Sequence, residues 1–342
     1  MVEYINNEPR DPYQNLLISV VVPTYKRPDP LERCLKALLT QNLAPTAYEV
    51  IVVDGAAWDT TEKQVNNWAS EARKTGHTIR YVPLPDADSN LTVARNYGWR
   101  AAHSHIVAFT NDDCIPEMSW LQGGLHAFTG SIAVVSGRIV MPLPPKPMDY
   151  EYDAFQITKT RFTTANCFYH RALLAQVGGF DERFATVWQE GNDLYLTLLQ
   201  QDIACTYVPE VVVMRPIIGT TPAPWGASLP RQRKDAFDAL LYKKHPVLYH
   251  KHIQASPPWQ HYVTTGFLLL TLLSLLTPIK LLAIIFLLAW LYMSGRFCIQ
   301  RLRKTSHAPG HVLEMIVTSI LIPPLVVLWR LWGMIRFRVL FL

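Results

Sequence analysis

The chain has 342 residues and a formal net charge of +5, enough for one large domain with an appendage or for two domains. From Tyr262 to the end there are eight Lys or Arg and one Glu, a net charge of +7, which leaves −2 for the rest. A basic balance confined to the tail argues against a nucleic-acid partner. The five cysteines are scattered and lack CxxC spacing, which argues against a disulfide framework or a structural zinc site.

The first third of the chain alternates apolar, β-rich runs with helical patterns. In chain order, the pattern predicts strands at 16–25, 48–56, 77–84 and 105–113, with helices at 29–42, 60–74 and 90–104 between them. This alternation predicts an α/β fold with a mostly parallel sheet covered by helices. Ligands of such sheets bind beyond the carboxyl ends of the strands. Tyr25, Asp54 and the pair Asp112–Asp113 are therefore expected on one edge.

The second half of the chain is less regular. We expect a strand at 131–143, a proline-rich loop at 141–150, a strand leading into a helix at 163–184, a helix at 188–202, a strand at 204–215 and a Pro/Gly-rich loop at 219–231. The basic, aromatic segment 226–261 is expected to form a linker helix at a membrane surface.

The tail contains the longest apolar run, residues 262–295, in which only Lys280 is charged. This run is long enough to cross a bilayer once, or twice as a hairpin that turns at Pro278. We expect a transmembrane hairpin at 262–298, because the basic cluster at 296–304 then stays on the side of the preceding domain. The remaining segment, 299–342, is expected to form a basic loop and a broken helix lying in the membrane interface.

The N-terminal extension, 1–15, is polar and has no apolar signal core. We therefore expect the domain that precedes the hairpin to remain cytoplasmic. The expected location is the cell inner membrane, with a multi-pass or hairpin anchor.

Two adjacent acids, Asp112 and Asp113, end the fourth expected strand. No G-x-G-x-x-G or Walker motif follows the first strand, so neither a dinucleotide oxidoreductase nor a P-loop NTPase has its phosphate-binding loop. Paired carboxylates at such a sheet edge suit a hard cation bound to phosphate oxygens. These residues suggest Mg²⁺ or Mn²⁺ and a nucleotide diphosphate.

Six segments occur in the order seen in family 2 glycosyltransferases of the GT-A fold, which the chain resembles over about residues 16–215. The segments are SVVVPTYKR, EVIVVDGAAWD, VARNYGW, IVAFTNDDCIPEMSWL, TANCFYHRALLAQVGGFDERF and YVPEVVV. The resemblance implies a GT-A domain at 16–225, a Rossmann-like sheet with helices on both faces. It also implies a nucleotide-diphosphate sugar as donor, with a UDP-sugar expected.

The resemblance also assigns residues to the donor. Arg95 would reach the nucleotide phosphates or the ribose, as its planar cation suits. Many relatives carry a histidine after the last strand, where Arg215 would instead neutralise the leaving diphosphate. The full set implied to bind the nucleotide sugar is Pro23, Thr24, Tyr25, Arg27, Asp54, Arg95, Asp112 and Arg215.

The metal motif of the family, Asp-x-Asp, falls on Asn111, Asp112 and Asp113. Asn111 takes the place of the first acid, so Asp113 is the expected metal ligand and Asp112 supports it. Restoring the family residue, Asn111→Asp, is then expected to tighten Mn²⁺ binding.

The catalytic base implied by the resemblance lies in a Glu-Asp pair, which falls on Glu190 and Gly191. Asp193 follows three residues after Glu190 and shares its helix face, so either carboxylate could be the base. We favour Glu190. Relatives usually carry Asp-Asp-Gly-Ser after the second strand, whereas this chain has 54–57 as Asp-Gly-Ala-Ala, which removes one polar contact to the nucleotide base.

The resemblance and the tail together imply an inverting glycosyltransferase that moves one sugar to an acceptor hydroxyl. The QxxRW signature of processive relatives is absent, which favours single additions. The membrane tail favours a lipid-linked acceptor, in the synthesis of a cell-envelope or extracellular polysaccharide or glycolipid. Because Gly55, Asn111 and Gly191 replace acids of the family pattern, the alternative is a catalytically weak homologue that acts as a membrane-tethered nucleotide-sugar-binding subunit.

Overall fold

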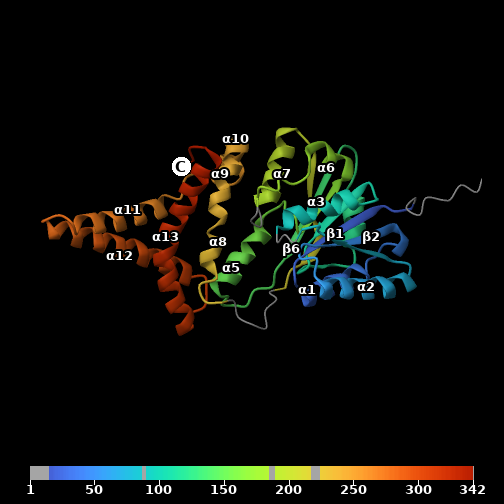
Figure 1. Ribbon diagram of the computed structural model, residues 1–342, viewed down its shortest axis with the longest axis horizontal. Helices are drawn as coiled ribbons and strands as arrows, with labels where there is room; N and C mark the ends of the chain where they lie inside the picture. The colour runs from blue at the N-terminus through green and yellow to red at the C-terminus, as the bar shows by residue number, and fades with distance from the viewer. Residues whose placement is uncertain (1–14, 87–89, 185–188, 217–223, 342) are drawn as a thin grey trace, which may run out of the picture. The chain divides into compact units, whose positions relative to one another are not determined.

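The computed structural model describes residues 15–341 except 87–89, 185–188 and 217–223 (Figure 1). The chain divides into two compact units, which are considered one at a time. Unit 1 comprises residues 1–140, 160–185 and 190–216, and unit 2 comprises 141–159, 186–189 and 217–342. The segment 141–159 therefore belongs with the C-terminal helices, an assignment that the contiguous domain limits expected from the sequence did not anticipate.

An eight-stranded sheet forms the centre of unit 1, in the order β3-β2-β1-β4-β7-β6-β8-β5. The strands are β1 (Ile18–Thr24), β2 (Tyr48–Asp54), β3 (Thr78–Pro83), β4 (Ile106–Thr110), β5 (Ile115–Pro116), β6 (Val134–Val140), β7 (Asn166–His170) and β8 (Cys205–Met214). Strands β1 to β4 are parallel, as the alternating sequence pattern predicted. In the second half, β7 is antiparallel to β4 and β6, β6 is parallel to β8, and β5 is antiparallel to β8.

The register of the parallel strands fixes which residues meet at the carboxyl edge. Thr24 is level with Asp54 of β2, and Val21 is level with Phe109 of β4. Continuing the second register by three residues brings Thr24 level with Asp112. The predicted common edge is therefore confirmed, because the ends of β1, β2 and β4 lie side by side.

Helices cover both faces of this sheet, and Figure 1 shows α1 and α2 on one face and α3 on the other. The helices of this unit are α1 (Pro28–Leu38), α2 (Asp59–Lys74), α3 (Leu91–Ala101), α4 (Trp120–His126), α6 (Arg171–Val177) and α7 (Gln189–Gln200), with a 3₁₀ turn η1 (Pro45–Ala47). Helix α3 lies very close to the sheet at Gly98. A Cβ added there would come within 2.3 Å of Val21 Cγ1, so this position requires glycine.

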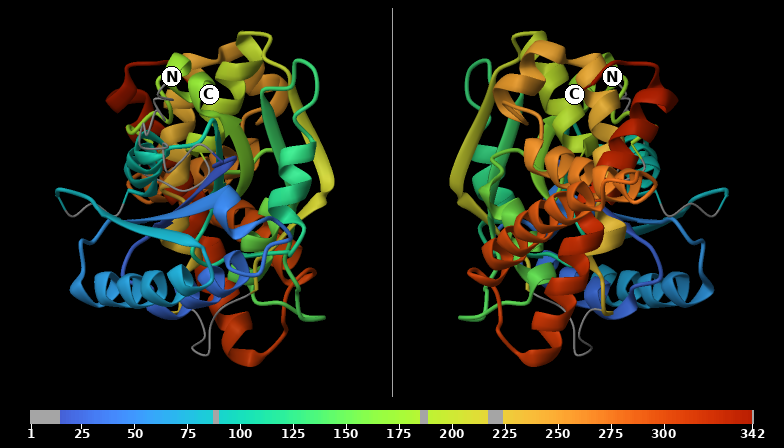
Figure 2. Two further views of the ribbon diagram at one scale, coloured as in Figure 1. Left: turned by 90° about the vertical axis from the view of Figure 1, so that its right-hand side faces the viewer. Right: turned by 90° about the vertical axis from the view of Figure 1, so that its left-hand side faces the viewer.

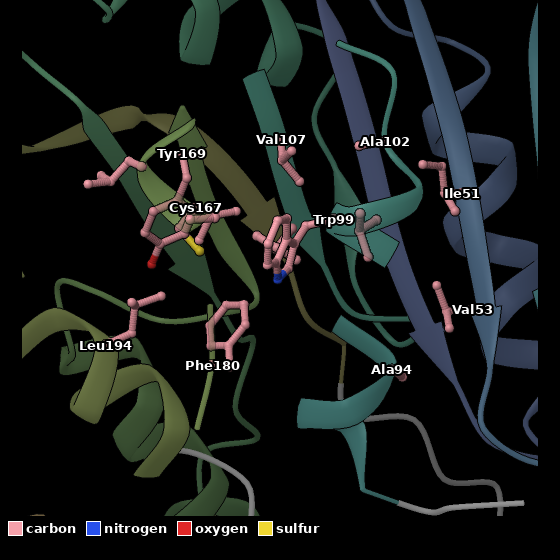
Figure 3. Packing of buried hydrophobic residues seen from close by; sticks show 14 of the residues in the cluster. Ile51, Val53, Ala94, Trp99, Ala102, Val107, Cys167, Tyr169, Phe180 and Leu194 are labelled. Carbon is pink, nitrogen blue, oxygen red and sulfur yellow. The ribbon is translucent and has the colours of Figure 1, made fainter. Parts of the chain in front are cut away.

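The core of unit 1 lies between the sheet and the helices α3, α6 and α7. Trp99 of α3, Tyr169 of β7 and Phe180 are its large members, and Leu194 of α7 closes one side (Figure 3). The Phe109 and Phe180 rings meet edge to face, with centroids 5.2 Å apart. This packing holds α3 and α7 against the end of β4, where the polar site residues begin.

Unit 2 is helical over the residues that the structure describes. Its helices are α5 (Asp149–Phe155), η2 (Gln156–Lys159), α8 (Ser228–Arg231), α9 (Lys234–Lys244), α10 (Pro246–His252), α11 (Trp259–Ser274), α12 (Lys280–Leu302) and α13 (Pro309–Phe337). Helices α11 and α12 lie side by side as an antiparallel pair joined by residues 275–279 (Figures 1 and 2). Helices α12 and α13 are long and apolar enough to cross a membrane.

Two expectations for this region were wrong. The segment 226–261 is not one linker helix, since α9 ends at Lys244 and Pro246 starts a new helix, where its missing N–H costs nothing. The expected break at Pro323-Pro324 is absent, because α13 is continuous through both prolines. Ile322 and Pro323 are buried, and α13 packs against α9, α11 and α12, so tertiary packing can keep the helix continuous despite the lost backbone hydrogen bonds.

Candidate active site

Two buried aspartates and two arginines meet at the carboxyl edge of the sheet. Asp112 accepts hydrogen bonds from Thr24 Oγ1 at 2.8 Å and from Arg27 Nη1 at 2.8 Å. Asp113 accepts a hydrogen bond from Arg215 Nη2 at 2.9 Å, and Arg27 lies 3.4 Å away. We call these five residues the edge cluster. They come from the ends of β1, β4 and β8 and from the turn before α1.

The two aspartates of the edge cluster differ in their electrostatics. Burial raises the pKa of Asp112 to about 6, against the opposing charge of Arg27. Burial acts in the same direction on Asp113, but Arg215 and Arg27 outweigh it and hold the pKa of Asp113 below its usual value. Asp113 is therefore the more fully ionised of the two carboxylates near neutral pH.

The donor chemistry of the edge cluster fits a hard divalent cation. Mg²⁺ is usually held by one or two carboxylates and completed by substrate phosphates. Asp112 and Asp113 supply two such carboxylates, and the described residues contain no cluster of three or more His, Cys, Asp or Glu able to hold a metal. A cation here would therefore need additional oxygen ligands from a bound diphosphate. It would also compete with Arg27 and Arg215, which pair with the two carboxylates in this structure.

A second group of polar residues is fully enclosed beside the edge cluster. Arg95 of α3 donates to Glu190 Oε1 at 3.1 Å and to Asn111 Oδ1 at 2.9 Å. Thr164 donates to the same Glu190 oxygen at 3.4 Å. Both charged side chains are only 1% exposed. We call Arg95, Asn111, Thr164 and Glu190 the inner network.

Two atoms of the inner network are buried without a hydrogen-bond partner among the described residues, Arg95 Nε and Glu190 Oε2. Such atoms are rare in folded proteins, and an ordered water, a bound ligand or a catalytic role can account for them. Glu190 thus keeps one carboxylate oxygen that can accept a proton.

The position of Asn111 differs from the sequence interpretation. Its side-chain oxygen faces Arg95 and not the neighbouring aspartates. Although Asn111 occupies the first place of the Asp-x-Asp pattern, the alternation of side chains at the strand end turns it toward the inner network. The expectation that an acid at this position would join the metal ligands therefore has no support in the geometry.

Arg95 also lies elsewhere than expected. Its side chain is buried and both terminal nitrogens are taken by Glu190 and Asn111, so it is not presented to a nucleotide at the edge. The structure instead makes Arg95 the partner that holds Glu190 in place.

The residues expected around the nucleoside lie at the ends of β1 and β2. Pro23 is buried within β1, and Tyr25 follows the strand and is partly exposed. Asp54 is fully buried, and its carboxylate accepts hydrogen bonds from the backbone N–H groups of Ala56 and Trp58 and from Tyr81 Oη at 3.0 Å. Asp54 therefore shapes the turn between β2 and α2, where the family's further polar residues are missing.

The two candidate bases lie one turn apart on α7. Asp193 is 3% exposed and Glu190 is 1% exposed, so both are enclosed. Between them, a Cβ added at Gly191 would lie 3.1 Å from Thr164 Cγ2, a tight but not forbidden contact. A residue larger than glycine at position 191 would therefore require a small shift of Thr164.

Two contributors were not identified from the sequence, Thr164 and Tyr81. Thr164 precedes β7, where a Thr-Thr pair before the Asn-Cys-Phe run was a weak signal. Tyr81 lies in β3, and only the register that brings β3 beside β2 reveals its contact with Asp54.

Comparison with known proteins places this edge in a family. Residues 19–175 match the model of the family described as "Glycosyl transferase family 2". The glycosyltransferase AglE of Haloferax volcanii is 26% identical over 226 residues, covering 63% of this chain and 70% of that protein. The validoxylamine A glucosyltransferase of Streptomyces hygroscopicus subsp. limoneus is 29% identical over 218 residues. The chain spans about half the length of that relative, 47% of it, with 53% of this chain covered.

Solved structures agree on the fold. The mannosyltransferase PcManGT from Pyrobaculum calidifontis, in complex with GDP-Man and Mn²⁺, superposes with a TM-score of 0.59 at 17% identity, covering 94% of this chain and 89% of that one. The match covers the segment that carries β1, β2, β4 and the edge aspartates, and the fold is shared beyond it. The family match over residues 19–175 and the named relatives together support a family 2 glycosyltransferase.

Proposed function

We propose that the protein transfers one sugar from a nucleotide-diphosphate sugar, with a UDP-sugar as the expected donor, to a hydroxyl group of a lipid-linked acceptor, with inversion at the anomeric carbon. The observation that carries this proposal is the edge cluster, in which two carboxylates and two guanidinium groups meet at the ligand-binding edge of the sheet. This combination suits a diphosphate with a divalent cation. The names of the relatives, a glucosyltransferase and a mannosyltransferase bound to GDP-Man, support a nucleotide-sugar donor.

In the proposed reaction the edge cluster binds the diphosphate. Asp113, with Asp112 beside it, would hold Mg²⁺ or Mn²⁺, which when bound stabilises the charge of the departing diphosphate. Arg27 and Arg215 release their carboxylates and turn to the phosphate oxygens, since guanidinium groups pair well with both kinds of oxyanion. Thr24 keeps its hydrogen bond to Asp112 and orients that carboxylate. Pro23, Tyr25 and Asp54 would border the nucleoside.

Glu190 is the proposed general base. Arg95 and Thr164 hold one of its oxygens, which leaves Oε2 to accept the proton of the acceptor hydroxyl. The resulting alkoxide attacks the anomeric carbon as the bond to the diphosphate breaks. Asp193 is the alternative base, because it lies one turn along the same helix.

The membrane arrangement is proposed from unit 2. Helices α11 and α12, which span 259–302 and so extend beyond the expected 262–298 at both ends, would form a hairpin through the inner membrane with the catalytic residues on the cytoplasmic side. A lipid-linked acceptor would reach the protein from this membrane. Such an acceptor places the reaction in the synthesis of a polysaccharide or glycolipid.

Helix α13 is long enough to cross, but its C-terminal half contacts a charged helix. Arg330 is 1% exposed, donates to Tyr262 Oη at 2.8 Å and lies 3.8 Å from Asp238 of α9. Lys243 of α9 donates to the carbonyl of Phe337 at 2.8 Å. A helix with the sequence KDAFDALLYKK is costly to place in hydrocarbon. We therefore propose that α13 lies in the cytoplasmic interface and does not cross.

The test is donor binding followed by turnover, using the full-length protein in detergent. Nucleotide sugars should raise the thermal unfolding temperature more in Mn²⁺ than in EDTA, and slow hydrolysis of the preferred donor should appear without an acceptor. Asp113→Ala should abolish both the Mn²⁺ dependence and the hydrolysis. Binding without hydrolysis or transfer would instead identify a nucleotide-sugar-binding subunit, and no binding of any nucleotide sugar would refute the proposal.

A further inference from the structure

The outward face of α12 carries an open hollow of about 470 Å³. It is lined by Tyr292, Gly295, Arg296, Ile299, Gln300 and Arg303, with Leu291 at one end. A Cβ added at Gly295 would meet no atom within 4 Å, so the missing side chain forms the floor of the hollow. All of these residues are exposed, and the opposite face of the helix packs through Ser294 and Cys298.

The arginines of α12 and Arg303, the residue that caps its C-terminus, fall into two classes. Arg301 points to the packed side, where it donates to Asp149 Oδ2 at 2.7 Å and to Thr318 Oγ1 at 2.8 Å. Arg296 and Arg303 point to the hollow, and neither has an ion-pair partner among the described residues. Helices α11 and α12 contain no Asp or Glu at all, so neither can supply an anion to these two arginines.

The spacing of these arginines suits one phosphate group. Arg303 lies seven positions after Arg296, about 10 Å along the helix axis. Two flexible arginine side chains can converge over that distance on an anion between them. Gln300 lies between the two and adds a side-chain donor. Toward the N-terminus of α12 the same face continues with the exposed apolar side chains of Ile284, Leu288 and Leu291.

We propose that this face of α12, called here the arginine hollow, binds an anionic membrane phospholipid. The lipid phosphate would pair with Arg296 and Arg303, and an acyl chain would lie along Leu288 and Leu291. The proposal rests on the membrane location given under the proposed function. The charge of the hollow indicates the ligand class. Two guanidinium groups without nearby acids, next to an apolar helix face, fit a molecule that is anionic at one end and apolar along the rest.

The experiment counts lipids retained by the full-length protein in native mass spectrometry from a mild detergent. Phosphatidylglycerol and phosphatidylcholine are added at equal concentration to the unaltered protein, to R296Q/R303Q and to the control R336Q/R338Q. The control removes the same two charges from exposed positions of unit 2 outside the hollow. We expect preferential retention of phosphatidylglycerol by the unaltered protein and the control, and about 30-fold weaker retention by R296Q/R303Q, from about 1 kcal/mol for each arginine.

Three results would overturn the proposal. An equal loss of phosphatidylglycerol retention in the two double variants would mean that overall positive charge, and not the arginine hollow, retains the lipid. Equal retention of both lipids by the unaltered protein would mean that the hollow does not select an anionic lipid. Displacement of the lipid by millimolar inorganic pyrophosphate would mean that the hollow binds free phosphates. Hydrolysis of the nucleotide sugar, measured on the same preparations, tests the proposed function separately, because neither arginine belongs to the edge cluster or the inner network.

Discussion

The edge cluster and the inner network are both built from carboxylates and guanidinium groups, yet they differ in access to water. In the edge cluster the side chains of Arg27 and Arg215 are 44% and 19% exposed, whereas in the inner network Arg95 and Glu190 are 1% exposed. Asn111 and Asp112, neighbours in sequence, belong to different groups because their side chains point in different directions.

This difference determines what each group can do. The arginines of the edge cluster are still partly hydrated, so they can exchange a carboxylate for a phosphate at a smaller cost than a fully buried arginine can. A buried pair has already lost its hydration, and removal of one partner costs about 3–5 kcal/mol. We infer that the edge cluster is arranged to change partners when a donor binds, and that the inner network is arranged to stay fixed.

The largest effect on activity is expected from replacing Glu190, the carboxylate of the inner network. Glu190→Gln should lower the turnover number by about 10²–10⁴-fold with little change in donor affinity, because the amide keeps the hydrogen bond from Arg95 but cannot accept a proton. Transfer rates under donor saturation, together with donor binding by calorimetry, measure the two quantities. Asp193→Asn is the matched variant on the same helix. A mild Glu190→Gln and a damaging Asp193→Asn would move the base to Asp193.

Removal of the Arg95 guanidinium should mainly lower the stability of unit 1. Arg95→Met leaves the buried Glu190 without its charge partner and should cost about 3–5 kcal/mol, seen as a large fall in the thermal unfolding temperature. The double variant R95M/E190L, which removes both charges, should recover most of that loss. If Arg95→Met unfolds at the temperature of the unaltered protein, the pair is not the fixed element that we describe.

Asn111→Asp tests which group position 111 belongs to. The new carboxylate would face Arg95, so two acids would share one guanidinium, and we expect a loss of about 1–3 kcal/mol in stability and no gain in Mn²⁺ affinity. Titration of Mn²⁺ in the presence of the donor checks this. Tighter Mn²⁺ binding would show that residue 111 turns toward the aspartates, as the family pattern suggested.

The smallest effect on stability is expected at the edge. Arg27→Gln should lower the free energy of unfolding by less than Arg95→Met does, because the Arg27 side chain is 44% exposed and the glutamine amide can still donate to Asp112. Arg215→Gln, with a side chain 19% exposed, should cost more. Donor affinity should fall in both variants. A large loss of stability in Arg27→Gln with unchanged donor binding would show that the edge arginines are structural.

Much of the fold could be predicted from the sequence, because the first strands are continuous apolar runs closed by turn residues. The run 16–25 contains β1, and the alternation of strands and helices required parallel pairing. The common edge expected for Tyr25, Asp54 and the pair Asp112–Asp113 followed from that pairing alone. In the second half, the mixed pairing of β7 and β6 left no comparable periodic signal.

The direction of side chains at the edge could not be predicted. A motif assigns Asn111, Asp112 and Asp113 to one role, but only coordinates show that the first belongs to another network. Likewise, an arginine on a helix next to a phosphate site looks like a phosphate ligand, and the burial of Arg95 against Glu190 depends on α7, almost one hundred residues later. Proline pairs mislead in a similar way, since tertiary packing keeps α13 helical across Pro323-Pro324.

The register between β1 and β4 determines which residues meet in the edge cluster. Val21 pairs with Phe109, and each further residue advances both strands by about 3.3 Å until Thr24 reaches Asp112. Inserting one residue within β1 would turn the Thr24 side chain to the opposite face and separate it from Asp112. Residues can therefore be added in the surface turns with little consequence, whereas the number of residues along these two strands determines whether the edge cluster can assemble.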